Sequence, residues 1–588
     1  MSGLFSTFNI AKRGMTVQQK SIDVTSHNIA NSNTVGYSRQ VARIETSRPY
    51  GGVTMGASTQ PGQLGTGSQI RAIERVRDTF LDYQVRNESS VLGKYGTRDN
   101  FLYEVESIFN EPSDTGISNL MGKFFDSFQE LSKQPNSSNS RTVAAQQTLA
   151  LTDALNTTYT QLEKLKVNSK DMLKNTVTEV NSLINQIDRV NQEIISVTVS
   201  NNTPNDLMDR RDLLLDELST KFGIVVEKDV FNGINVKPAE SGSVKANQLI
   251  NSSPNGDVAR FSYVTNVEKD KNDLSGSTYI VTYYKNGDMT SEDNKQTMKV
   301  SGIDEEKAAK ILSNGILWAD RTGQASRGDG YPIRDGEVIA YEQLMMFTPT
   351  SGTVNGLVSV QKDIQSYMNQ LDKLAKSIAF TVNAVHSSEI DAGKDSLPFF
   401  VNKDTVKYNP SGTGATTDGE DKISAKNITV NKEILDDVMK INAGKDKESG
   451  EGDGQRALAI AQLRNSLVRI QDINETVITR EDLFTKGGSA LAADGLGVVN
   501  SKSGMSLSSY FKDTIDRLGV QAQEAGRMVK NQGDLLYSIE ESRASVSGVS
   551  LDEEMANLIQ FQHAYNANAK IVSTVDELLE VIINGLKR

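Results

Sequence analysis

LDEEMANLIQFQHAYNANAKIVSTVDELLEVIINGLKR, residues 551–588, carries the pattern of one long amphipathic helix. Acidic residues fill its first turn, where they suit the positive helix end, and Ser550 with Glu553 fits a capping box. Apolar side chains then recur in steps of three and four, with one turn skipped at Gln562; the principal ones are Leu551, Met555, Leu558, Tyr565, Val572, Leu579 and Ile582. Such a stripe predicts a coiled-coil surface, so this helix needs a partner.

A second stripe of the same kind lies near the start of the sequence. It runs over residues 4–29 in unbroken steps of four and three, and its large apolar members are Leu4, Phe8, Met15, Ile22 and Ile29. Each such side chain contributes roughly 1.5–3 kcal/mol when buried. Ordering the backbone costs about 1–2 kcal/mol per residue, so this helix should not be stable alone.

Charge favours a pairing of these two helices. Residues 1–50 hold six basic and two acidic side chains, whereas residues 551–588 hold three basic and six acidic ones. The net charges of +4 and −3 attract each other, although the attraction is modest and is screened by salt. We therefore expect the two helices to lie side by side.

The sequence between the two stripes changes character twice. Residues 72–222 are mostly helical by pattern, and a regular apolar stripe over 173–194 includes Asn191. Residues 224–345 are rich in Gly, Asn and Thr with short alternating runs, and Asn232-Gly233 and Asn286-Gly287 signal hairpins. Helical patterns return at 354–386, near 455–472 and at 505–543.

This layout predicts a mainly α chain with an inserted β part. We expect an elongated, multi-domain molecule whose terminal helices pair as a coiled coil, with a helical bundle built from both chain halves. The predicted domains are residues 1–48 with 549–588, residues 49–223 with 350–548, and a β-rich domain at 224–349.

Composition excludes several classes of function. The net charge of −12 argues against a nucleic-acid surface, and the absence of cysteine excludes disulfides and thiolate metal sites. No window approaches 18 apolar residues, so no membrane-spanning helix is expected. The first residues lack the apolar core of a signal peptide, which leaves open a cytosolic protein or one exported without a cleaved signal.

Candidate chemical sites are few. Of the three histidines, His27, His386 and His563, only His386 has a spaced acidic neighbour, Glu389, and it lacks a third ligand, so a solvated histidine at a helix end is expected. The tripeptide Arg327-Gly328-Asp329 lies in a glycine-rich turn, which explains it better than adhesion does. We expect no catalytic residue, cofactor or metal, and no enzymatic activity.

Two polar motifs point to a known family. The first, over 28–39, contains Asn28, Asn31, Asn33, Thr34, Gly36 and Tyr37; the second, over 551–570, contains Gln562 and Asn568. Together they resemble the N- and C-terminal signatures of bacterial flagellar rod, hook and hook-associated proteins. The run over 545–554 is most similar to that of the hook-associated members at the hook–filament junction. The resemblance covers the ends and the helical layers, not the central region.

The resemblance implies a structural protein that joins the distal end of the hook to the filament by helical polymerisation of its terminal helices. The implied partners are further copies of the chain, the hook protein, a second hook–filament junction protein and an export chaperone at the C-terminal segment. The implied location is the extracellular flagellum, reached by type III export without a cleaved signal. A hook or rod subunit is the alternative within the family. An adhesin or an enzyme on a coiled-coil stalk is the alternative outside it.

Overall fold

The computed structural model describes residues 2–48, 65–240, 244, 247–273, 276–387, 397–407, 419–446, 449–486, 490–492 and 495–585. The chain divides into two compact units. Unit 1 comprises 1–94, 175–355 and 530–588; unit 2 comprises 95–174 and 356–529. Four long helices, α2, α4, α7 and α11, contribute one part to each unit. The three-domain division expected from the sequence stays a prediction.

Unit 1 contains both chain ends and most of the strands. Its elements, including those shared with unit 2, are α1 (Ser2–Ala30), β1 (Gln40–Thr46), β2 (Ser68–Arg75), α2 (Thr79–Phe109), α4 (Ser138–Val199), α5 (Asn205–Lys221), β3 (Ile224–Lys228), β4 (Ile234–Pro238), β5 (Arg260–Lys269), β6 (Tyr279–Tyr284), β7 (Lys295–Ser301), α6 (Glu305–Asn314), β8 (Ile316–Ala319), β9 (Val338–Ala340), α7 (Gly352–His386), α11 (Leu507–Ser547) and α12 (Leu551–Gly585).

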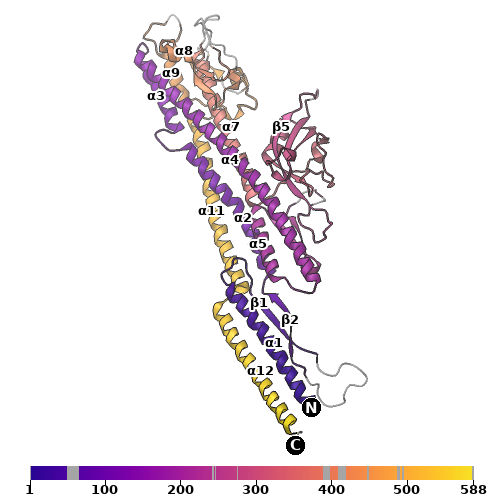
Figure 1. The fold of residues 1–588 in the computed structure, drawn as a ribbon. Helices are drawn as coiled ribbons and strands as arrows, with labels where there is room; N and C mark the ends of the chain where they lie inside the picture. Colours follow the sequence, from indigo (N-terminus) through magenta and orange to yellow (C-terminus); the bar gives the residue numbers. More distant parts are fainter. Residues whose placement is uncertain are drawn as a thin grey trace. The chain divides into compact units, whose positions relative to one another are not determined.

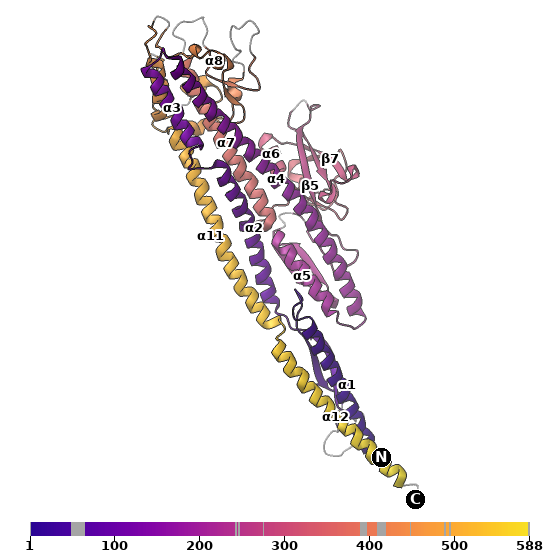
Figure 2. The same cartoon turned by 60° about the vertical axis from the view of Figure 1, so that its left-hand side comes forward.

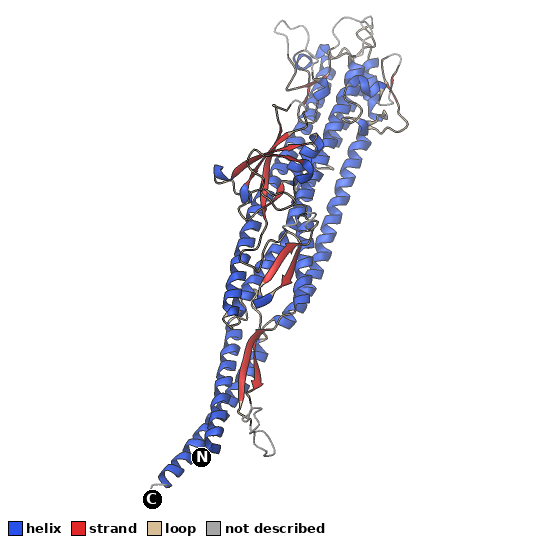
Figure 3. Ribbon diagram, turned by 90° about the vertical axis from the view of Figure 1, so that its right-hand side faces the viewer, coloured by secondary structure: helices blue, strands red, loops and turns tan. Residues whose placement is uncertain are grey.

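The β part of unit 1 is built on a five-stranded sheet of order β8-β5-β6-β7-β9. All neighbouring pairs are antiparallel except β7 with β9. Phe222, Phe261, Trp318 and Phe347 are buried and pack as one aromatic cluster beside the sheet. The fold is therefore mainly α with an inserted β part, as predicted (Figure 3).

The hairpin signals are confirmed in part. Asn232-Gly233 lies in the connection between the antiparallel strands β3 and β4. Asn286 and Gly287 both have positive φ, as the signal requires, but the connection from β6 to β7 runs over 285–294 and is not a two-residue turn. Strands β1 and β2 form a further antiparallel pair, which crosses the domain boundary predicted at residue 48.

Buried asparagines fasten the helices to the strands. The carboxamide of Asn191 accepts a hydrogen bond from the Ile234 N–H at 3.0 Å and donates one to the Ile234 carbonyl at 3.2 Å. Asn181 holds both backbone groups of Phe261 in the same way, at 3.0 and 2.7 Å. Each carboxamide offers one donor and one acceptor, as a neighbouring strand would. The N–H and the carbonyl near the start of the strand are buried, and the carboxamide satisfies both.

Unit 2 is a helical body with short strand pairs. Besides its parts of α2, α4, α7 and α11, its elements are α3 (Ile117–Lys133), β10 (Phe400–Asn402), β11 (Ile428–Val430), α8 (Lys432–Asp436), α9 (Gln455–Gln462), α10 (Arg480–Thr485), β12 (Ala490–Leu491) and β13 (Val498–Val499). The predicted helix at 455–472 is shorter than expected, because α9 ends at Gln462. Phe124, Phe125, Phe128 and Phe399 are buried in its core.

Asparagine repeats its role in unit 2. The carboxamide of Asn383, on α7, accepts from the Phe400 N–H at 2.8 Å and donates to the Phe400 carbonyl at 2.9 Å. Phe400 begins β10, just as Ile234 begins β4. The same device thus joins a long helix to a short strand in both units.

His386 is fully buried at the end of α7, so the expectation of a solvated histidine was wrong. Its Nε2 accepts a hydrogen bond from the Asn442 N–H at 3.0 Å, which makes Nδ1 the protonated nitrogen that donates to the Leu397 carbonyl at 3.0 Å. Burial, with a contribution from the nearby cations of Arg456 and Arg141, lowers the pKa of His386 to about 4. Glu389, its proposed metal partner, lies outside the described residues.

Acid should destabilise unit 2 through His386. Its folded pKa of about 4 lies below the usual value of 6.5, so between these pH values the unfolded chain binds the proton and the folded chain does not. Relative to His386→Gln, the wild type should lose about 2–3 kcal/mol of unfolding free energy between pH 7.5 and pH 4.5. Urea unfolding followed by circular dichroism at both pH values measures this.

The comparison with His386→Gln is needed because Asp372 acts in the opposite sense. Burial raises the pKa of Asp372 to about 6, so its contribution to stability grows as the pH falls. Asp372 is present in both proteins and cancels from their difference. If the difference in unfolding free energy between the wild type and His386→Gln did not change with pH, His386 would take up its proton as readily in the folded chain as in the unfolded chain, and the prediction would be wrong.

Candidate assembly interface

The two terminal helices pack against each other in antiparallel orientation. Asn28, near the end of α1, contacts Glu554, near the start of α12, and Gly14 faces Asn568 in the middle of both helices. Figures 1 and 2 show the pair side by side with the two chain ends close together. The pairing predicted from the two apolar stripes is therefore present in unit 1.

The predicted stripe residues are half-buried in the structure, with two exceptions. The half-buried ones are Leu4, Phe8, Met15, Ile22 and Ile29 on α1 and Leu558, Tyr565, Val572, Leu579 and Ile582 on α12. Leu551 and Met555 are instead about half exposed, because the buried position in the first turn belongs to Glu554. Whether any of these residues contacts another subunit stays a prediction.

Asn28 is the point where three segments meet. Its carboxamide donates to the Gln40 carbonyl at 2.9 Å and to Oε2 of Glu554 at 3.0 Å. It accepts from the Gln40 N–H at 3.0 Å and from the Tyr37 hydroxyl at 2.8 Å. Asn28 and Glu554 are 1% and 3% exposed, so every bond is shielded from water. One side chain thus joins the end of α1 to β1 and α12.

The other motif residues shape the turn between α1 and β1. The N–H of Asn31 donates to the His27 carbonyl at 3.1 Å, and the N–H of Thr34 donates to the Asn31 carbonyl at 2.9 Å. Gly36 has φ of +81°, which a side chain would strain. Burial raises the pKa of Tyr37, with help from the charges of Asp206, Asp209 and Glu554, and so keeps its hydroxyl a donor. Asn33 is exposed.

The C-terminal motif residues differ in their surroundings. Asn568 is half-buried where the helices cross, and a Cβ on Gly14 would lie 2.6 Å from its Oδ1. Glycine at position 14 therefore permits the close approach of α1 to α12. Gln562 is exposed, and nothing in this structure explains its place in the motif.

Opposite charge contributes less to the pairing than expected. Arg39 forms an ion pair with Glu553 at 2.8 Å, but Arg39 lies after α1 and not on it. Among the described residues of α1 and α12, no ion pair joins one helix to the other. The facing apolar side chains and the Asn28 contacts therefore hold the pair.

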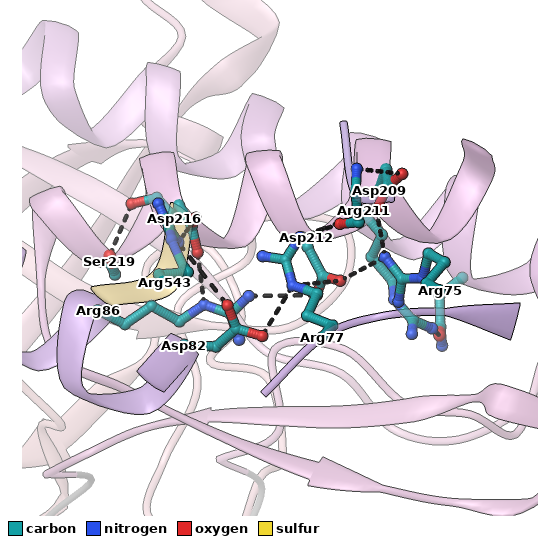
Figure 4. Close-up of polar contacts among 12 residues, drawn as sticks. Arg75, Arg77, Asp82, Arg86, Asp209, Arg211, Asp212, Asp216, Ser219 and Arg543 are labelled. Carbon is teal, nitrogen blue, oxygen red and sulfur yellow. Dashed lines mark hydrogen bonds and ion pairs between the residues drawn. The ribbon is translucent and has the colours of Figure 1, made fainter. Parts of the chain in front are cut away.

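A buried ion network lies next to this pair in unit 1 (Figure 4). We define it as the Arg–Asp network: Arg75, Arg77, Arg86 and Arg543 with Asp82, Asp209, Asp212 and Asp216. Its shortest ion pairs measure 2.6–2.8 Å. The side chains come from β2, the connection from β2 to α2, α2 itself, α5 and the last turns of α11. The network thus fixes α11 to α5 just before α12 begins.

The network reaches the motif turn through Ser38. The Ser38 hydroxyl donates to Oδ1 of Asp209 at 2.7 Å, and the Ser38 N–H donates to Oδ2 of Asp209 at 3.0 Å. Burial alone would raise the pKa of Asp212, but the cations of Arg77, Arg75, Arg86 and Arg211 outweigh it and lower that pKa to about 2. Asp212 therefore stays ionised at neutral pH.

Sequence reasoning missed this network, although a signal was present. Asp209, Asp212 and Asp216 are spaced by three and four residues, which places them on one face of a helix. Arg75 and Arg77 are two residues apart, which places both on one face of a strand. Complementary charges on two such faces predict a contact.

The remaining candidates of the sequence have ordinary surroundings. Arg327 is engaged by Glu337, and its N–H donates to the Tyr331 carbonyl within a tight turn, so turn structure accounts for this tripeptide. His563 is exposed on α12. The described residues contain no group of three metal-ligating side chains, and none of the described helices is long and apolar enough to cross a membrane.

The paired helices leave much apolar surface uncovered. Large apolar side chains that are 38–70% exposed are Phe5 and Ile10 on α1 and Leu551, Met555, Ile559, Ile571, Leu578, Val581 and Ile583 on α12. Two helices have too few facing positions to bury both sets. Exposed apolar groups gathered along one element are typical of a protein interface.

Three segments of the chain match models of flagellar protein families, and two of these segments include the terminal helices. Residues 102–302 match the model for the helical domain of the flagellar hook-associated protein FlgK. Residues 8–37 match the flagella basal body rod protein model, and residues 541–585 match the C-terminal model of flagellar basal body rod FlgEFG proteins.

Whole-chain relatives give the same result. The chain is 30% identical to flagellar hook-associated protein 1 of Bacillus subtilis (strain 168), over 100% of this chain and 99% of that one. It is 23% identical to the Escherichia coli (strain K12) protein of that name, over 98% and 99%. The solved flagellar hook junction protein FlgK of Burkholderia pseudomallei has a similar fold, with a TM-score of 0.50 at 13% identity, covering 79% of this chain and 100% of that one.

Removing the Asn28 carboxamide should loosen the link between α1, β1 and α12. Asn28→Ala leaves the Gln40 N–H and carbonyl and the Glu554 carboxylate without this partner, which should cost about 2–4 kcal/mol. Amide exchange at Gln40 measures the loss. The matched control is Asn33→Ala, at an exposed motif position, which should change exchange little; equal effects of both variants would contradict this role of Asn28.

Proposed function

Because this chain belongs to the family of flagellar hook-associated protein 1, and is thus a structural protein of the junction between flagellar hook and filament, we propose that it polymerises through its terminal helices. The observation that carries the proposal is the uncovered apolar surface of the α1–α12 pair. Neighbouring copies of the chain supply the cover. In such an assembly each copy buries the exposed residues of the next.

The proposed partners follow from this assembly. Further copies pack around the α1–α12 pair, the hook protein lies on one side of the junction, and a second hook–filament junction protein lies on the other. Before assembly, an export chaperone covers the C-terminal segment, whose apolar residues on α12 are the most exposed of the pair. The chain reaches the outside of the cell by type III export without a cleaved signal.

We keep two further expectations as proposals. The protein acts as a structural component and not as an enzyme, in line with the structural family to which it belongs. The chain is organised into three domains, with residues 1–48 and 549–588 as the assembly domain, residues 49–223 and 350–548 as the helical domain, and 224–349 as the β-rich domain. Strands β3 to β9 all fall inside the last range, which supports it.

Charge on the facing sides of α12 should block assembly. Leu558→Glu with Leu579→Glu places two carboxylates on the half-buried stripe, where α1 gives them no partner. Cells that carry only this variant should lack filaments, which electron microscopy measures. Trp318, the single tryptophan, is buried on strand β8 and should keep its native fluorescence, which shows that the β part still folds.

The matched control adds the same charge elsewhere on α12. Gln560→Glu with Ser573→Glu changes two exposed positions and should leave the α1–α12 pair intact. Normal filaments on cells with the Leu558 and Leu579 variant would refute polymerisation through these helices.

In the free monomer the terminal helices should be only marginally stable. The Asn28 contacts fix one end of the α1–α12 pair, whereas the apolar residues toward the chain ends stay half exposed. Amide exchange should therefore be slowest near Asn28 and fast toward Leu4, and protection should rise on assembly. Strong protection across residues 4–29 in the monomer would sink the idea.

A further inference from the structure

Arg211 is a buried cation of unit 1 that forms no ion pair with any described residue. In the Arg–Asp network, four arginines pair with four aspartates. Arg211, on α5 between Arg210 and Asp212, is a fifth arginine in the same region and is buried. Among the described residues, no carboxylate lies within ion-pair distance of its guanidinium. Asp212 attracts Arg211 from beyond ion-pair distance, and Arg211 has no directly paired carboxylate.

The hydrogen bonds of Arg211 do not supply the missing charge. Its Nη1 donates to Oδ1 of Asn191 at 2.9 Å and to the Asn232 carbonyl at 2.7 Å, and both acceptors are neutral. Its Nε is buried and has no partner among the described residues. The whole residue is 6% exposed, so bulk water does not solvate it. A guanidinium that keeps a free donor in such a place has capacity for a further acceptor.

Burial of a cation without a paired anion is unfavourable. The unpartnered Nε of Arg211 therefore suggests that an anion binds there. Burial lowers the pKa of Arg211 to about 10, against the Asp212 carboxylate and with a contribution from the neighbouring cations of Arg75 and Arg86. Desolvated charges in proteins are stable when they are paired and hydrogen-bonded. An anion beside Arg211 would relieve both the desolvation and the repulsion.

There is room for such an anion. Arg211 lines a cavity of about 530 Å³ that is bounded by β2, the start of α2, α5 and the β3–β4 pair, all in unit 1. Lys228 also lines this cavity and adds a second positive charge. This volume is large enough to hold a carboxylate or a phosphate group together with bound water.

The acidic residues that line the cavity are already engaged. Asp82 and Asp212 belong to the Arg–Asp network, and Glu74 forms an ion pair with Arg43 at 3.1 Å. Asp229 accepts hydrogen bonds from the Val230 N–H at 2.8 Å and from the Asn235 side chain at 3.3 Å. Cations offset the charges of Asp82, Asp212 and Glu74, whereas the donors to Asp229 are neutral and leave its charge in place; none of these four carboxylates forms an ion pair with Arg211.

We propose that this cavity binds an anionic oxygen group, a carboxylate or a phosphate, with Arg211 as the principal donor. Two sources carry this chemistry: a small anion from solution, or an acidic side chain of a second copy of the chain. The binding site itself rests on Arg211 and the cavity, not on the proposed polymerisation.

The test follows the Nε–Hε resonance of Arg211 in the full-length chain with ¹⁵N-labelled arginine. Inorganic phosphate and citrate are titrated at constant ionic strength. We expect this resonance to shift and to saturate as the anion is added. Calorimetry should give an affinity for the anion that is at least tenfold weaker in Arg211→Met than in the wild type. These two results together would identify the ligand as a small anion from solution. Arg321→Met, at a half-exposed arginine of unit 1 outside the cavity, is the matched control and should keep the wild-type affinity.

The second arm dilutes the protein without added anion. A resonance shift that depends on protein concentration, together with a change in sedimentation that Arg211→Met abolishes, assigns the carboxylate to a second copy. A resonance that responds neither to phosphate, nor to citrate, nor to dilution means that water alone fills the cavity and overturns the proposal. The wild-type titration stands without any variant, and Arg211→Lys, which keeps the charge, tests the donor geometry if Arg211→Met fails to fold.

Discussion

The structure depends on one recurring interaction, in which an asparagine carboxamide on a helix holds the N–H and the carbonyl of a single strand residue. Asn28 holds Gln40, Asn181 holds Phe261, Asn191 holds Ile234, and Asn383 holds Phe400. A strand that begins against a helix exposes backbone groups that the helix backbone cannot satisfy, because its own groups are bonded internally. The carboxamide solves this problem with one donor and one acceptor. It makes each contact directional, which apolar packing alone does not.

At the assembly interface this interaction does more than satisfy a strand. Asn28 also binds the Glu554 carboxylate, so the start of α12 is located by the end of α1. The Arg–Asp network fixes the end of α11 close to the same point. Buried ion pairs of this kind add little net stability, because desolvation offsets their attraction, but they discriminate strongly against wrong arrangements. The α1–α12 pair is therefore well placed at one end while it stays weakly packed along its length.

Weak packing along the pair fits a protein of the hook–filament junction. A helix pair that satisfied itself would have no reason to bind neighbours. Here the facing residues are only half-buried, and a second apolar set on α12 is left to solvent. In the proposed assembly, contacts between copies would supply the free energy that the monomer lacks. Polar contacts position the α1–α12 pair, and in the proposed assembly the apolar residues stabilise it against neighbouring copies. Different residues therefore carry the two roles.

The sequence by itself determined the two terminal stripes, the change to β structure near residue 224, the buried stripe of α4 and the family motifs, because each depends on local periodicity or on adjacent residues. It also contained the three-and-four spacing of Asp209, Asp212 and Asp216, without saying what faced them. Only the tertiary structure decided that Asn28 meets Glu554, that His386 is buried, and that Arg211 lacks a carboxylate. These facts depend on which side chains from distant segments share one small volume, and burial and pairing of charge are properties of that volume and not of any one segment.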